Sequence, residues 1–185
     1  MATEKALTTL ALEYVKTIGI ANNGVSGRGF ANPCDLAISE DGRIFVINRC
    51  DTVRKQAVRV GVCTLGEEYL TEFGNGYGDA PGQFVWPVAM AFDSRDRLHI
   101  TDEHNDRVTV FNSSGEFISV WGDSGEGPDQ LNRPSGIGFD SNDTAYVADQ
   151  SSNSIKKFNR DGDFLGAFGE TGSGLGQLDT PWGVT

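Results

Sequence analysis

Three side chains with oxygen atoms stand at the ends of short apolar runs. Asn48 ends the run Ile-Phe-Val-Ile-Asn, Asp102 ends Leu-His-Ile-Thr-Asp, and Asp149 ends Ala-Tyr-Val-Ala-Asp. Carboxylate and amide oxygens are ligands that a hard cation such as Ca²⁺ prefers, and the same groups cap loops by accepting backbone N–H bonds. These residues therefore predict either a divalent-metal site where they converge or a set of structural loop caps.

Two further polar residues follow these runs directly. Asp51 lies in the stretch after Asn48, and His104 lies in the stretch after Asp102. Variable polar residues on loops at the end of a rigid scaffold are typical of recognition, although a single loop histidine is usually only solvated. We take His104 as the catalytic candidate of an enzyme and Asp51 as a candidate ligand contact. His99 stands in the middle of its apolar run and is expected to pack in the core.

The elements that position these residues are repeated along the chain. Pro87, Pro134 and Pro181 are 47 residues apart, and Pro33 lies 54 residues before Pro87. Pro33, Pro87 and Pro134 each begin a unit of two apolar stretches, joined by a turn with Gly, Asp or Asn. The second stretch of each unit ends in Asn48, Asp102 or Asp149. Two more stretches follow, and the last ends in an aromatic residue and a glycine. Four short strands per unit predict the blades of a β-propeller, and no sustained helical period is present.

Composition agrees with a turn-rich globular chain and excludes two classes of partner. The chain has 24 glycines among 185 residues, above the average share of about 7%. A formal net charge of -11 argues against binding to nucleic acid. No apolar run approaches the roughly 20 residues of a membrane span. The three cysteines do not form a disulfide framework, so we expect a cytoplasmic protein; a secreted one with a Cys50–Cys63 bridge is the alternative.

From Glu13 to Thr185, the pattern resembles the NHL-repeat family. The resemblance rests on the prolines, on strands that end in Ile-Thr-Asp or Val-Ala-Asp, and on the glycine-rich links. The run Asp102–Val108 is similar to the family signature Asp-x-x-Asn-His-Arg-Ile, with Asp106 in place of the histidine. The resemblance implies a ring of six blades. Similar propellers of the gluconolactonase and paraoxonase type bind a divalent metal and cleave lactones or organophosphates. The resemblance therefore also implies a metal-dependent hydrolase as an alternative. Zinc-dependent amidating lyases need several histidines, and the two present here disfavour that activity.

The repeat predicts one all-β domain over residues 1–185, a propeller of four-stranded antiparallel blades with three complete blades. The blades are expected at about 34–73, 88–121 and 135–168. Residues 13–18 copy a fourth strand and residues 182–185 copy a first strand, so both are spare. Three blades would leave two apolar faces bare. We therefore expect a homodimer that closes six blades, with a truncated chain as the alternative.

Two functions remain open. The first is a scaffold that binds a protein, peptide or small ligand through blade-edge loops at the mouth of the channel. Trp86 and Arg133, which precede the prolines, and Asp51 would be its ligand contacts. The second is a hydrolase of esters, lactones or phosphotriesters that uses Ca²⁺ or another divalent metal. Its metal ligands would be Asn48, Asp102 and Asp149, with His104 as the catalytic residue.

Overall fold

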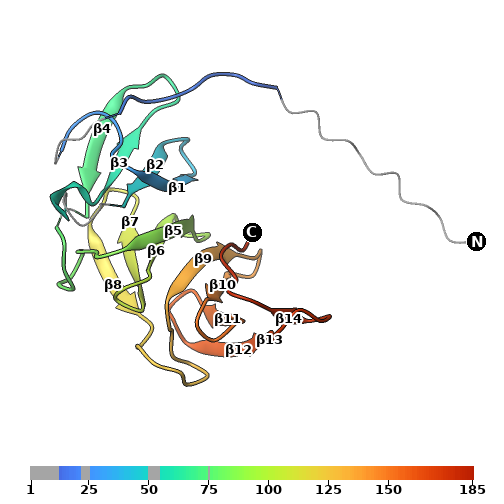
Figure 1. Ribbon diagram of the computed structural model, residues 1–185. Helices are drawn as coiled ribbons and strands as arrows, with labels where there is room; N and C mark the ends of the chain where they lie inside the picture. Colours follow the sequence, from blue (N-terminus) through green and yellow to red (C-terminus); the bar gives the residue numbers. More distant parts are fainter. Residues whose placement is uncertain (1–12, 22–25, 50–54, 75) are drawn as a thin grey trace, which may run out of the picture.

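A computed structural model describes residues 13–21, 26–49, 55–74 and 76–185. It contains three four-stranded antiparallel sheets, each with its strands in sequence order. Figure 1 shows them side by side along an arc, with β1, β5 and β9 nearest the centre and β4, β8 and β12 outside. The predicted all-β fold with three four-stranded blades is confirmed.

Blade 1 consists of β1 (Pro33–Ile38), β2 (Ile44–Asn48), β3 (Arg59–Cys63) and β4 (Tyr69–Phe73), with a short 3₁₀ helix, η1 (Lys55–Ala57), before β3. Blade 2 consists of β5 (Pro87–Phe92), β6 (Arg97–Asp102), β7 (Arg107–Asn112) and β8 (Phe117–Trp121). Blade 3 consists of β9 (Pro134–Phe139), β10 (Thr144–Asp149), β11 (Ser154–Asn159) and β12 (Phe164–Phe168), and the short parallel pair β13 (Glu170–Thr171) and β14 (Gln177–Leu178) follows it.

The backbone conformation of the first hairpin turn in each blade explains why Gly or Asp stands there. Gly42, Asp96 and Asp143 have φ values of 83°, 57° and 59°, in the left-handed region that Gly and Asp tolerate best. The carboxylates of Asp96 and Asp143 also join neighbouring blades. The backbone N–H of Glu40 donates to Asp96 over 3.2 Å, and that of Ser94 donates to Asp143 over 2.9 Å. Each bond runs from one blade to the next blade along the chain.

Apolar and aromatic side chains between adjacent blades form the core. Phe45 of blade 1 contacts Phe92 of blade 2 with ring centroids 5.1 Å apart. At the equivalent place, His99 of blade 2 contacts Phe139 of blade 3 at 4.8 Å. His99 is fully buried, so its predicted packing role is confirmed. Tyr146 holds the same position in blade 3, on the face that no described blade covers.

The buried His99 has a defined tautomer. The indole N–H of Trp121 donates to its Nδ1 over 3.3 Å, so Nδ1 must be an acceptor and Nε2 carries the proton. Nε2 lies 3.4 Å from a carboxylate oxygen of Asp93. Burial lowers the pKa of His99 and outweighs the opposing effect of Asp93, which keeps the imidazole neutral. Burial raises the pKa of Asp93, but hydrogen bonds from His99 and Arg97 outweigh it and hold this pKa well below its usual range.

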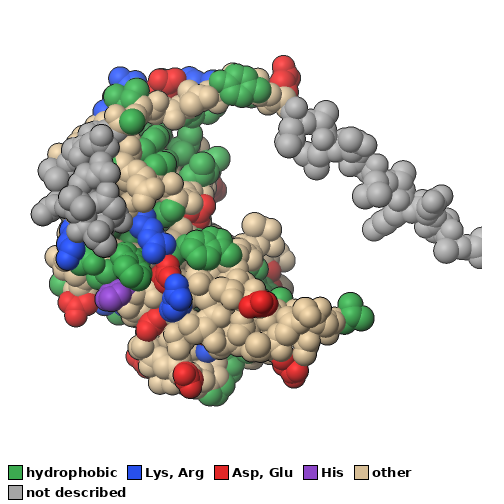
Figure 2. All heavy atoms as spheres, viewed as in Figure 1, with side chains coloured by type: hydrophobic (Ala, Val, Ile, Leu, Met, Phe, Trp, Pro, Cys, Tyr) green, Lys and Arg blue, Asp and Glu red, His purple; other side chains and the backbone are tan. Residues whose placement is uncertain are grey.

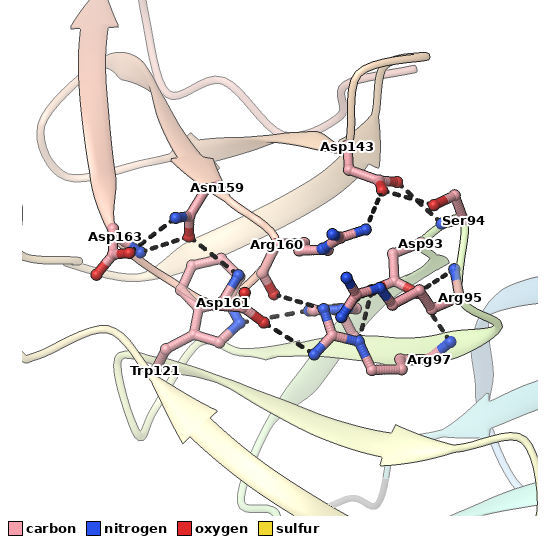
Figure 3. Close-up of polar contacts among 11 residues, drawn as sticks. Asp93, Ser94, Arg95, Arg97, Trp121, Asp143, Asn159, Arg160, Asp161 and Asp163 are labelled. Carbon is pink, nitrogen blue, oxygen red and sulfur yellow. Dashed lines mark hydrogen bonds and ion pairs between the residues drawn. The ribbon is translucent and has the colours of Figure 1, made fainter.

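Ion pairs extend this network between blades 2 and 3 (Figure 3). Arg97 lies between two carboxylates, with Nε 2.7 Å from Asp93 and Nη1 2.9 Å from Asp161. Arg160 pairs with Asp143 over 2.6 Å. The network therefore joins the first hairpin turn of blade 2 to two turns of blade 3.

The turn between the third and fourth strands contacts the preceding blade. A Cβ added at Gly115 would lie less than 3.0 Å from the ring of Phe73, and one added at Gly162 would lie equally close to Trp121. Both glycines also have a positive φ. In blade 1 the equivalent residue is Glu67, with a φ of 70°. Blades 2 and 3 therefore need glycine where an aromatic residue of the preceding blade packs, and blade 1 has a glutamate there.

The segment before blade 1 lies against this glutamate. Lys16 and Arg28 form ion pairs with Glu67 over 3.1 and 3.6 Å. The backbone N–H of Phe30 donates to the carbonyl of Ile20 over 2.9 Å. Residues 13–20 form no strand, because a fourth strand needs a third strand beside it and the described sheets offer none.

The last residues lie beside β9 at the centre of the arc. The backbone N–H of Gly136 donates to the carbonyl of Trp182 over 2.8 Å. Residues 182–185 are not in a sheet but take the place beside β9 where the first strand of another blade would lie. Cys63 is a free thiol, and Cys50 lies outside the described residues. Among the described residues, no helix has the length and apolarity needed to cross a membrane.

Candidate functional site

The candidate residues gather at one end of the channel because of strand pairing. Pro33 pairs with Asn48, Pro87 with Asp102, and Pro134 with Asp149. The start of each first strand therefore lies beside the end of each second strand. Residues that precede the prolines and residues that follow the polar strand ends meet at this channel mouth.

Asp102 acts as a cap at the channel mouth. It is fully buried, and its carboxylate accepts backbone N–H bonds from Val85 (2.7 Å), Trp86 (3.0 Å), His104 (3.0 Å) and Asn105 (3.1 Å). These bonds tie the loop before β5 to the loop after β6. Replacing the carboxylate would leave several buried donors without an acceptor.

Asn48 and Asp149 have similar roles and are also fully buried. The side-chain oxygen of Asn48 accepts the backbone N–H of Ala31 over 2.8 Å. Asp149 accepts the backbone N–H of Asn132 over 3.2 Å and forms an ion pair with Lys156 over 2.8 Å. In this structure, therefore, all three predicted metal ligands are loop caps.

This donor set does not fit a divalent cation, because the oxygens already serve N–H groups and an ammonium group. The part of the chain that the structure describes contains no group of three His, Cys, Asp or Glu residues that could hold a metal ion. We derive no metal chemistry from these residues. The metal role of Asn48, Asp102 and Asp149 stays a prediction that metal analysis tests.

A charged cluster that joins all three blades lies directly beside these caps. Arg49, Glu103 and Gln150 each follow one of the capping residues, in blades 1, 2 and 3. Arg49 Nη2 lies 3.0 Å from Glu103 Oε2, and Arg133 Nε lies 3.1 Å from Glu103 Oε1. The backbone N–H of Gln150 donates to the carbonyl of Arg133 over 3.3 Å. One carboxylate therefore holds two guanidinium groups from neighbouring blades.

Two aromatic rings border this cluster. The guanidinium carbon of Arg49 lies 5.4 Å from the ring centroid of Trp86, a cation–π distance. Trp86 and His104 meet edge to face with centroids 5.2 Å apart. Figure 2 shows Lys or Arg, Asp or Glu, and His side chains together on the face turned to the viewer.

The structure thus brings together three of the predicted site residues, Trp86, Arg133 and His104. Asp51 lies outside the described residues. Sequence analysis missed Arg49 and Glu103. Their signal was their place directly after the capping residues, where the repeat carries one charge of each sign.

A hollow of about 320 Å³ lies on the channel side of the first strands. Its lining comes from all three blades and the C-terminal segment: Cys34, Asp35, Leu36, Val88, Ala89, Met90, Gly136, Ile137, Trp182, Gly183, Val184 and Thr185. Cys34, Val88 and Gly136 are one or two residues from the prolines at the mouth. The charged cluster therefore stands at one end of this hollow.

Comparison with known proteins supports the propeller assignment. Residues 90–169 match the model of a family described as "6-bladed beta-propeller" (DUF5128). NHL repeat-containing protein 3 of Homo sapiens is 23% identical over 112 residues, which are 60% of this chain and 31% of that protein. The chain thus covers about a third of the curated relatives that it matches.

Two solved structures show the same fold. Virginiamycin B lyase from Staphylococcus aureus, in a structure with quinupristin, has a TM-score of 0.61 at 14% identity; the match covers 89% of this chain and 47% of the lyase. A nidogen/laminin complex has a TM-score of 0.54 at 21% identity, over 71% of this chain and 45% of the matched chain. Each match spans a little under half of the solved chain. The chain thus has the fold of three β-propeller blades and is similar to a family of six-bladed propellers and to an NHL repeat-containing protein.

Proposed function

We propose that this chain is a propeller scaffold that binds a ligand at the channel mouth. The observation that carries the proposal is the cluster of Arg49, Trp86, Glu103 and Arg133, which comes from three blades and lies on one face. A charged group beside an aromatic ring at the edge of a rigid fold is typical of recognition sites. Arg133 leaves 54% of its side chain exposed, so it is available to a ligand.

The two solved relatives support the proposal at the level of the fold. One is a lyase in a structure with quinupristin, and the other belongs to a complex of two proteins. The same architecture therefore serves both a small molecule and a protein. For this chain, we propose a short peptide segment of a protein partner, or a small ligand of similar chemistry.

An array of short peptides with acidic, basic and neutral side chains tests this function. We expect the purified chain to bind one class, and Trp86→Ala and Arg133→Gln to weaken that binding about tenfold or more. Arg95→Gln is the matched control, because Arg95 is exposed at the opposite end of blade 2 and its loss changes the net charge equally. Binding that both channel-mouth variants retain would overturn the proposal.

The metal-dependent hydrolase stays a prediction from the sequence, because the engaged oxygens of Asn48, Asp102 and Asp149 do not favour it, and it has a direct test. The purified chain is analysed for bound divalent metal, and its melting temperature and ester hydrolysis are measured with added Ca²⁺, Mn²⁺ or Zn²⁺. A copurifying metal or a metal-dependent activity would support the hydrolase. If the ion neither copurifies nor changes either property, the hydrolase is rejected.

We also propose that two copies of the chain close a ring of six blades. Blade 1 exposes 57% of Leu36 and 61% of Ile38, beside an apolar hollow of about 330 Å³. Blade 3 exposes 54% of Phe168. Ile38 holds the position in blade 1 that Phe92 and Phe139 hold in blades 2 and 3. Tyr146 holds the position of Phe45 and His99, which contact those two rings. In the closed pair, Tyr146 of one copy would thus pack on Ile38 of the other.

A further inference from the structure

The charged cluster at the channel mouth has two arginines and one glutamate, and the carboxylates of Asp102 and Asp106 lie beside it. Two guanidinium groups, Arg49 and Arg133, share the single carboxylate of Glu103. Glu103 is only 4% exposed, so its charge lies beneath the two arginines and not beside them in solvent. A ligand that reaches this surface therefore meets the arginines first.

Several N–H donors of the cluster have no partner among the described residues. Arg49 uses Nη2 for its ion pair, and Arg133 uses Nε and Nη2. A guanidinium group has five N–H bonds in a planar fork, so each arginine keeps donors for a second acceptor. The Trp86 ring packs against the guanidinium of Arg49 and holds it in place.

Gln150 adds an independent observation. Its residue is 4% exposed, and its Nε2 is buried without a hydrogen-bond partner in the part of the chain described here. Gln150 lies in blade 3 at the position that Arg49 and Glu103 hold in the other blades, and its backbone N–H donates to the carbonyl of Arg133. A buried amide donor without an acceptor destabilises the folded chain, unless something at the site accepts from it.

We propose that Arg49, Arg133 and Gln150 form a binding site for an oxyanion, a carboxylate or phosphate group of the ligand. Such a group has several acceptor oxygens and no donor, and it matches the planar fork of arginine. It would accept N–H bonds from the two guanidinium groups and from Gln150. Trp86 would pack against the remainder of the ligand. The inference rests on the proposed function and names the chemistry of its ligand.

Isothermal titration of the full chain with sodium phosphate and with succinate, in a low-salt buffer, tests the site. We expect one of the two anions to bind, and Arg133→Gln to weaken it about tenfold, the effect of one charge-assisted hydrogen bond. Gln150→Glu keeps the size of the side chain but replaces its donor by a negative charge, so it should abolish binding. Arg95→Gln should leave the affinity unchanged.

The outcomes separate the alternatives. Binding of phosphate alone would assign a phosphoryl group to the ligand, and binding of succinate alone would assign a carboxylate. If neither anion binds, or if folded Arg133→Gln and Gln150→Glu both bind as the unchanged chain does, the oxyanion site is overturned. Should the peptide array still show binding that depends on Trp86, the proposed function stands and only the oxyanion inference fails.

Discussion

Closure of a ring by two copies depends on Glu67. In blades 2 and 3 the equivalent residues are Gly115 and Gly162, where a Cβ would come within 3.0 Å of an aromatic side chain of the preceding blade. In a closed pair, the exposed Phe168 of one copy would reach Glu67 of the other. The glutamate has both a Cβ and a charge at this place, so we expect it to weaken association of the unchanged chain.

The size of this effect follows from the geometry. Overpacking a close contact costs about 1–3 kcal/mol, and a two-fold pair contains the contact twice, so Glu67 would cost roughly 2–6 kcal/mol of association. Because about 1.4 kcal/mol corresponds to tenfold in affinity, Glu67→Gly should strengthen the dimer by about 30-fold or more. Glycine also removes the strain of a non-glycine residue at a φ of 70°.

Light scattering after size-exclusion chromatography, over a range of concentrations, measures the effect. We expect Glu67→Gly to approach twice 19.9 kDa at a lower concentration than the unchanged chain. Glu67→Ala is the matched control, because it removes the charge and the ion pair with Lys16 but keeps the Cβ. If Glu67→Gly and Glu67→Ala strengthen dimerisation equally, the charge of Glu67, and not its Cβ, opposes association. If the unchanged chain and Glu67→Gly are both stable monomers at micromolar concentration, ring closure by two copies is refuted.

The remaining predictions concern the buried polar residues. His99→Ala should lower the free energy of unfolding by about 3–5 kcal/mol in urea titrations followed by tryptophan fluorescence, whereas His99→Phe, which copies Phe45, should lose less. Because the pKa of His99 is lowered in the folded chain, the stability that neutral His99 contributes is present above the unfolded pKa of about 6.5 and is lost as the pH falls. The melting temperature should therefore drop towards pH 5, and it should drop less in His99→Phe. Asp102→Ala should lower the free energy of unfolding by about 2–4 kcal/mol, because four backbone donors lose their acceptor. A single lost cap costs only about 1–2 kcal/mol. An unchanged unfolding curve would contradict the capping role.

The repeat made the fold predictable, because the spacing of Pro87, Pro134 and Pro181 and the turn residues between them define each blade without reference to long-range contacts. The buried position of His99 also followed, since an aligned place that accepts Phe, His and Tyr indicates packing. The channel-mouth cluster was only partly predictable. Trp86 and Arg133 were found by their place before the prolines.

Other features depend on contacts between blades that one repeat does not contain. Glu103 of blade 2 holds Arg49 of blade 1 and Arg133, which directly precedes blade 3, and a pattern read along one blade gives no sign of that pairing. The same reason applies to Glu67, whose importance appears only when Gly115 and Gly162 are seen beneath the aromatic residues of their neighbours. The choice between a metal ligand and a loop cap at Asp102 likewise depends on backbone N–H groups from a different loop.

The turn-to-turn hydrogen bonds give the row of blades a direction. Glu40 donates to Asp96 and Ser94 donates to Asp143, so each blade donates forward and accepts from behind. Blade 1 has Gly42 at the acceptor position and therefore has no carboxylate to offer a blade before it. The repeats are consequently not interchangeable. A duplicated blade 2 inserted before blade 3 would continue the row unbroken, whereas a duplicated blade 1 in that place would interrupt it.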